Sequence, residues 1–129
     1  MIDTQLILKY CGVRISAQAL SAAIATGVDQ PTVATELWHA LTALASTEAQ
    51  IAQLVPTLRD ALQDIERVLA AGPDDRIPVV DSTGVLQARG PRLDALIGRR
   101  AAQVEHVRAL TRLWGTRHPD PAPATPAPR

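Results

Sequence analysis

The sequence predicts an all-α protein, a helical bundle of three long or four to five shorter helices with one small β-hairpin. Alanine and leucine dominate its 129 residues, with 22 and 15 occurrences, and both favour helix over strand. Phenylalanine is absent, and Tyr10, Trp38 and Trp114 are the only aromatic residues, so the core must be aliphatic. Apolar residues also recur at alternating steps of three and four, which is the spacing of one helix face.

The longest apolar stripe runs through residues 32–71 and predicts an interface. One unbroken helix over this range would span about 60 Å, whereas a compact chain of this length has a radius of gyration of about 13–14 Å. The helix must therefore break or be covered by a partner. The predicted interface residues on this stripe are Leu37, Leu41, Leu44, Glu48, Ile51, Val55, Leu58, Leu62, Ile65 and Leu69.

Two signals mark where this stripe could break. Thr47 and Gln50 have the spacing of a capping box, which starts a helix. Pro56 lacks a backbone donor and costs about 3 kcal/mol or more inside a helix unless the helix kinks. Two alternatives therefore stay open, one kinked helix or two helices at 32–45 and 47–71. In the preceding stretch, 3–27, Gly12 interrupts a similar stripe and Ser16 can cap a fresh start, so one bent helix or two short ones are possible.

A short β-hairpin is expected at 77–88. Residues 77–80 and 85–88 are apolar runs, and Asp81 to Gly84 between them suits a type I turn. An isolated two-stranded hairpin is marginal in water, so it must lean on the helices or on another chain. A last helix is expected at roughly 91–114.

Arg100 interrupts the apolar stripe of this last helix. Its charge can reach solvent past its own methylene groups, or it can pair with an acid across an interface. Glu48 is the candidate partner, because it fills the other charged slot within an apolar stripe. We therefore add Arg100 to the predicted interface.

The C-terminal residues 116–129 contain five of the ten prolines and predict a disordered, extended tail. The preceding residues, 1–115, then form a single helical domain. Opposite net charges distinguish the two halves of the chain, −3 over 1–72 and +3 over 73–129, and such halves can pack on each other or on a second copy.

Composition argues against several functional classes. Cys11 is the only cysteine, which excludes an intrachain disulfide and favours a reducing compartment. No apolar run reaches about 18 residues, so we expect a cytoplasmic protein without a membrane span. The histidines and Cys11 lack metal-ligand spacing, and the glycine-rich phosphate loops are absent. We therefore expect no metal, no cofactor and no enzymatic activity.

One stretch, 23–33, resembles the helix-turn-helix of bacterial repressors, with a small residue, a glycine four later and a valine six beyond that. The resemblance implies a first helix at 16–26, a turn at 26–31 and a recognition helix at 31–45 that enters the major groove of DNA. The residues that would then contact base edges are Gln30, Thr32 and Thr35.

Charge disfavours this DNA-binding alternative. No Lys or Arg occurs between Ile15 and Leu58, whereas Asp29, Glu36 and Glu48 do, and cations supply most non-specific affinity for DNA. Glu36 also departs from the apolar residue that the motif expects.

A second resemblance concerns HEPN-type ribonucleases, which carry an Arg and a His four to six residues apart. The pairs Arg100/His106 and Arg112/His118 have that spacing, but such pairs arise by chance in an arginine-rich chain. The sequence therefore favours a non-enzymatic assembly protein that binds itself or a protein partner through its apolar stripes.

Overall fold

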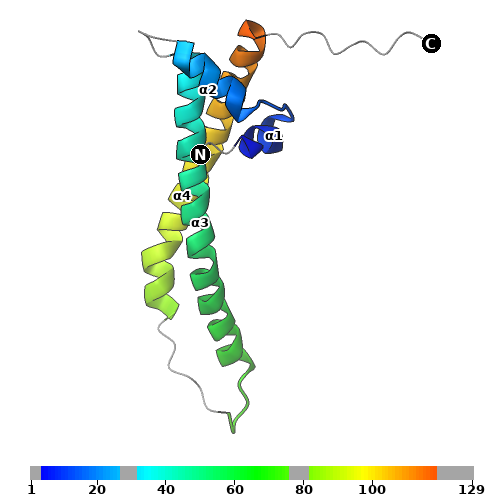
Figure 1. Ribbon diagram of the computed structural model, residues 1–129. Helices are drawn as coiled ribbons and strands as arrows, with labels where there is room; N and C mark the ends of the chain where they lie inside the picture. Colours follow the sequence, from blue (N-terminus) through cyan, green and yellow to red (C-terminus); the bar gives the residue numbers. More distant parts are fainter. Residues whose placement is uncertain (1–3, 27–31, 76–81, 119–129) are drawn as a thin grey trace, which may run out of the picture. The chain divides into compact units, whose positions relative to one another are not determined.

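The computed structural model describes residues 4–26, 32–75 and 82–118, and every regular element among them is an α-helix (Figure 1). The all-α prediction is therefore confirmed. These residues form two units: unit 1 contains those of 1–45 and 102–129, and unit 2 contains those of 46–101. The helices are α1 (Gln5–Cys11), α2 (Ala17–Thr26), α3 (Val33–Ala70) and α4 (Ser82–Arg117).

Local chemistry explains why the N-terminal stretch forms two short helices, the second of the two alternatives. Gly12 follows α1 with a φ of 69°, a left-handed conformation that glycine adopts without strain. Its N–H donates to the Leu8 carbonyl at 3.0 Å. Ser16 then begins α2, because its hydroxyl accepts a hydrogen bond from the Ala19 N–H at 3.0 Å.

Of the two alternatives for the long stripe, the division into helices at 32–45 and 47–71 is wrong, and the single helix is found, because α3 is one helix of 38 residues. It begins at Val33, directly after Thr32, whose hydroxyl accepts a hydrogen bond from the Thr35 N–H at 3.2 Å. Thr47 lies inside the helix and is only 2% exposed, so it caps nothing. The physical reason is register: Leu44 and Ile51 are seven residues apart, and continuous helix keeps both on one stripe. Pro56 occupies an exposed position within α3.

The β-strand predicted at 85–88, the second strand of the hairpin, is wrong. Residues 85–88 belong to α4, while 77–80 lie outside the described residues. Leu86 stands seven residues before Leu93, so the apolar seam of the last helix extends back through this segment, and leucine, glutamine and alanine favour helix. Pro91 is consequently inside α4 rather than at its start. At the other end α4 continues to Arg117, so residues 116 and 117 of the predicted tail are helical, and 119–129 lie outside the described residues.

Unit 1 contains a well-formed aliphatic core. All four helices contribute to it, together with Ile15 from the α1–α2 connection. Its most deeply buried side chains, none more than 1% exposed, are Ile7, Leu20, Leu37, Leu41, Leu44 and Val107.

Unit 2 has far fewer buried apolar side chains than unit 1. Its helical parts are the C-terminal part of α3 and the N-terminal part of α4, which are antiparallel (Figure 1). Among its described apolar side chains, only Leu58, Ala61 and Leu96 are buried. Among the described residues of unit 2, no third helix covers the remaining apolar faces of these two, so much of the stripe is open to solvent.

Candidate functional site

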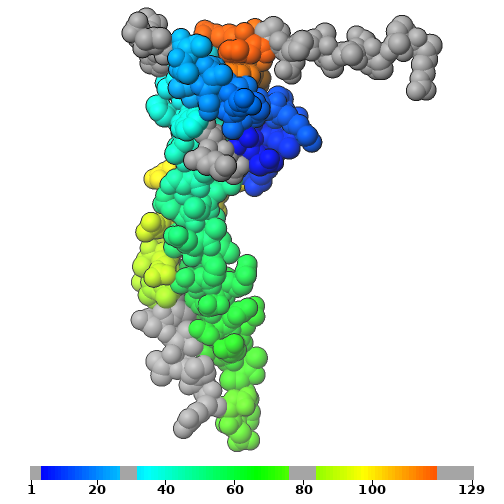
Figure 2. Space-filling model, viewed as in Figure 1, coloured from blue at the N-terminus to red at the C-terminus, as the bar shows by residue number. Residues whose placement is uncertain are grey.

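The candidate assembly site is the exposed part of the α3 stripe in unit 2. Leu62 is 52% exposed and Leu69 is 81% exposed. In the view of Figure 2 no other described segment lies in front of this part of α3. We call this stripe the apolar ridge. Helical periodicity places its members on one face, and they are Ile51, Val55, Leu62, Ile65 and Leu69.

The predicted interface residues therefore separate into two groups. Leu37, Leu41 and Leu44 are buried in the core of unit 1, where the protein's own side chains cover them. In unit 2, Leu58 is buried as well. The remaining apolar members form the ridge and keep part or most of their surface open, and α4 adds Ile97, which is 49% exposed.

Glu48 and Arg100 are brought together within unit 2. Arg100 Nε donates to Glu48 Oε1 at 3.4 Å, with side-chain exposures of 37% and 25%. The hypothesised pair is thus present and joins α3 to α4 within the chain. It links one turn of α3 to one turn of α4.

We expect this ion pair to contribute little stability. Partly exposed pairs are typically worth 0–1 kcal/mol, because water screens both charges. A double-mutant cycle with Glu48→Gln and Arg100→Gln, followed by urea unfolding, should give a coupling energy of about 0.5 kcal/mol. A coupling above about 2 kcal/mol would show instead that the pair behaves as a buried one.

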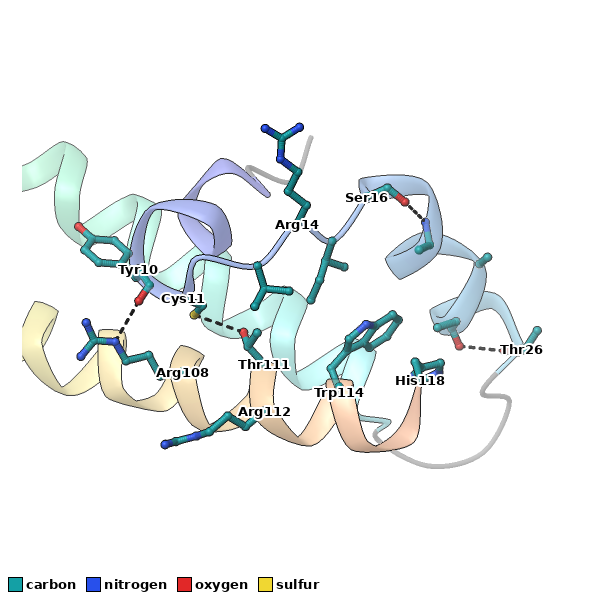
Figure 3. A pocket seen from close by; sticks show the side chains of 16 residues that line it. Tyr10, Cys11, Arg14, Ser16, Thr26, Arg108, Thr111, Arg112, Trp114 and His118 are labelled. Carbon is teal, nitrogen blue, oxygen red and sulfur yellow. Dashed lines mark hydrogen bonds between the residues drawn. The ribbon is translucent and has the colours of Figure 1, made fainter. Parts of the chain in front are cut away.

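Unit 1 contains a groove of about 1130 Å³ between the α1–α2 connection, α2 and α4 (Figure 3). Its walls are largely apolar and include Val13, Ile15 and Trp114, with small alanines on the α2 side. The indole ring of Trp114 stacks on His118, with ring centroids 3.9 Å apart and an interplanar angle of 16°. Near the end of α1, Cys11 Sγ lies 3.6 Å from Thr111 Oγ1.

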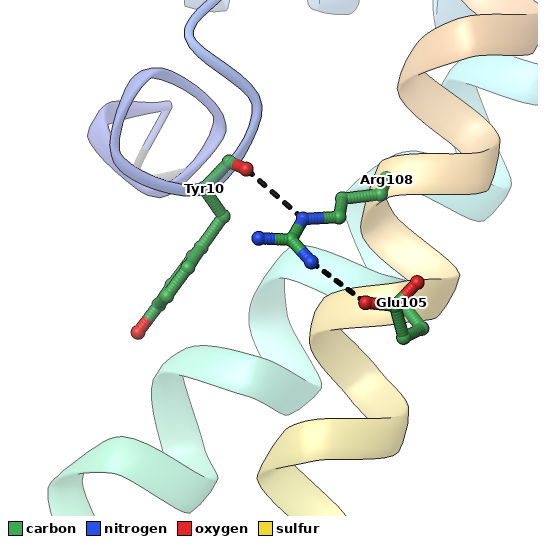
Figure 4. A network of polar contacts seen from close by, with 3 residues as sticks. All are labelled: Tyr10, Glu105 and Arg108. Atoms are coloured by element: carbon green, nitrogen blue, oxygen red, sulfur yellow. Dashed lines mark hydrogen bonds and ion pairs between the residues drawn. The ribbon is translucent and has the colours of Figure 1, made fainter.

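A polar network fixes one edge of this groove (Figure 4). Arg108 Nε donates to the Tyr10 carbonyl at 3.1 Å, and its Nη1 lies 2.7 Å from Glu105 Oε1. Because Tyr10 lies near the end of α1 and the other two residues lie on α4, the arginine ties the two helices together. Its guanidinium is thereby held in place beside the groove.

The residues of the DNA-binding alternative are only partly described. Thr32 and Thr35 are half-buried, and their hydroxyl oxygens lie 3.1 Å apart. Gln30 and the predicted turn at 27–31 lie outside the described residues. The recognition helix predicted to end at residue 45 instead continues to Ala70.

The two Arg/His pairs of the ribonuclease alternative, Arg100/His106 and Arg112/His118, have different surroundings. His106 is exposed on α4, and Arg100 contacts Glu48. Arg112 and His118 both line the groove, but the histidine ring is occupied by its stack with Trp114.

Comparisons with protein-family models, curated proteins and solved structures find no match to this chain. Within the described residues, no group of three His, Cys, Asp or Glu side chains could hold a metal ion, and no helix is long and apolar enough to cross a membrane.

Sequence reasoning found the ridge but missed the groove. Its lining comes from three separate segments, and no local pattern indicates that α2 and α4 leave a space between them. Two signals were nevertheless available, the small residues Ala19, Ala22 and Ala23 on α2 and the four-residue spacing of Arg108 and Arg112 on α4.

Proposed function

We propose that this protein is a non-enzymatic helical assembly protein that associates with a second copy of itself through unit 2. The observation that carries this proposal is the exposure of Leu62, Leu69 and Ile97 on a two-helix unit with few buried apolar side chains. Leaving such side chains in water forfeits the favourable transfer of apolar surface. The two helices of a second copy of unit 2 would cover them and complete a four-helix bundle.

Charge favours a second copy as the occupant of this surface. The α3 part of unit 2 carries four acids against two arginines, whereas the described α4 part carries four arginines against one aspartate. In a two-fold symmetric pair, α3 of one copy can lie against α4 of the other, and each contact then occurs twice. The opposite charges of α3 and α4 would steer the two copies of unit 2 into this arrangement. The like charges of two α3 helices would disfavour packing of α3 against α3. The charged residues are Glu48, Asp60, Asp64, Glu66, Arg59 and Arg67 on α3, and Arg89, Arg92, Arg99, Arg100 and Asp94 on α4.

The expected association is reversible rather than permanent. Burying Leu62, Leu69 and Ile97 contributes on the order of 1–2 kcal/mol for each side chain, and a dimer buries each of them twice. Association costs about 4–15 kcal/mol in lost freedom. The partly exposed ridge residues Ile51, Val55 and Ile65 bury further apolar surface in the dimer. We expect a surplus of about 8 kcal/mol over the cost, so that the dimer fraction changes with protein concentration in the micromolar range.

Light scattering during size-exclusion chromatography tests this proposal. The expected mass is twice the 13.8 kDa of one chain at high loading, falling towards one chain on dilution. A strict monomer at concentrations on the order of 50 µM would overturn it, because the dissociation constant would then lie well above the expected range.

DNA is the alternative partner, and we expect no salt-sensitive binding of this protein to duplex DNA. The ends of α2 and α3 at Thr26 and Val33 suit a helix-turn-helix, but the missing cations between Ile15 and Leu58 remove the usual phosphate contacts. The measurement is a fluorescence-anisotropy titration of duplex DNA at low and high salt. Binding at low salt that disappears at high salt, and that Thr35→Ala weakens, would reverse the ranking of the two functions.

A further inference from the structure

We propose that the groove in unit 1 binds a small amphipathic anion, a carboxylate attached to an acyl or aryl chain. Its walls supply apolar surface from Val13, Ile15 and Trp114. Its sixteen lining residues include three arginines and no aspartate or glutamate. An apolar cavity with a few polar groups at one edge is the usual form of a small-ligand site. The three arginines are Arg14, Arg108 and Arg112.

The dimensions favour a small molecule over a peptide helix. α2 forms one wall and has 10 residues, so that wall is about 15 Å long. Isolated helices below about 12–15 residues are only marginally formed in water, and a helix of that length would extend beyond the wall. The volume of about 1130 Å³ slightly exceeds the usual range of small-ligand cavities, about 300–1,000 Å³, so the groove is large enough for a small molecule with a long apolar chain.

The positions of the arginines place the carboxylate at the mouth of the groove. In Figure 3 the side chains of Arg14 and Arg112 point outward from opposite sides of the cavity. Arg108 is already held by Tyr10 and Glu105, so its own charge is partly compensated. Arg14 and Arg112 are exposed and can turn towards a bound anion to make charge-assisted hydrogen bonds. The chain of the ligand then extends inward over Trp114.

Tryptophan fluorescence can report this binding directly. Trp38→Phe leaves Trp114, which lines the groove, as the single tryptophan. We expect a saturable change in its emission on titration with dodecanoate below the micelle concentration. Dodecyltrimethylammonium, which has the same chain and the opposite charge, should bind at least about tenfold more weakly, a difference of 1.4 kcal/mol.

Two variants in the Trp38→Phe background separate the groove from general adhesion of detergent. Ala22→Phe should fill the groove and abolish the saturable change, because Ala22 lines it and is exposed. Ala25→Phe is the matched control, since Ala25 is an exposed residue of α2 outside the groove lining, and it should bind normally. Circular dichroism would verify that both variants fold.

The arginines are tested by charge removal. Replacing Arg14 and Arg112 together with glutamine should weaken dodecanoate binding at least about tenfold, while Arg117→Gln, outside the lining, should not. Equal affinity for the two amphiphiles, or unchanged binding by Ala22→Phe, would overturn the proposal. Binding of an acidic peptide without binding of dodecanoate would overturn it too. These outcomes are independent of oligomeric mass, so they do not depend on self-association through unit 2.

Discussion

Replacing Leu62 and Leu69 together with glutamate is expected to keep the protein monomeric at concentrations where the unchanged chain dimerises. Both side chains lie on the apolar ridge and are largely exposed in the single chain, at 52% and 81%. The substitution therefore costs the folded monomer little. In a dimer it removes the apolar burial of both leucines and brings carboxylates into a dry contact, where an unpaired charge costs several kcal/mol. We expect the dissociation constant to rise at least about 100-fold.

Gln63→Glu is the control for this double variant. Gln63 is exposed on the same part of α3 and lies about 100° around the helix from Leu62, so it adds one negative charge off the ridge, whereas the double variant adds two on it. Sedimentation equilibrium of the three proteins at matched concentrations measures the effect. If Leu62→Glu/Leu69→Glu and the unchanged chain had the same mass distribution, the ridge would not be the contact surface, whatever the oligomeric state.

The helical pattern predicted the class of the fold and one face of α3, but not which part of that face is covered. Leu44 and Leu62 occupy equivalent positions in one continuous stripe, and nothing local distinguishes them. Leu44 is buried because α1, α2 and α4 contribute to the core around that part of α3, whereas α4 is the only other helix among the described residues of the unit that contains Leu62. Burial is thus decided by elements distant in the sequence, which periodicity does not report.

The errors within the helices have a related cause. Thr47 with Gln50 and the 85–88 segment each carry a local signal, a cap and a strand, that competes with the longer apolar register. The helix prevails in both cases: around Thr47 a continuous helix keeps Leu44 and Ile51 on one stripe, whereas a cap contributes about 1 kcal/mol, and at 85–88 leucine, glutamine and alanine favour helix. The Arg100–Glu48 pair could be predicted from the sequence, because each residue places a charge in an apolar stripe. A charge that is buried without a partner is costly, so two such charges are candidates to pair with each other.

Leu44→Ala is expected to reduce the free energy of unfolding of unit 1 by about 3–5 kcal/mol. Leu44 is fully buried in the core of unit 1, and truncation there loses the transfer energy of the side chain and leaves a cavity. Domains of this size have a total stability of about 5–15 kcal/mol, so the loss is a large fraction of it. Trp38 and Trp114 both belong to unit 1, and their fluorescence during urea unfolding reports this unit.

Leu62→Ala makes the same chemical change at the equivalent position of the ridge and gives the matched comparison. Because Leu62 lies in unit 2, whose sequence contains no tryptophan, its urea unfolding is followed by circular dichroism of the helices. At low protein concentration it should cost less than about 1 kcal/mol, because Leu62 is half exposed in the single chain. As concentration rises, its cost should grow, since a dimer that buries Leu62 stabilises the unchanged chain by mass action. The cost of Leu44→Ala should stay constant. Equal and concentration-independent losses at the two positions would mean that unit 2 packs as fully as unit 1 without a second copy.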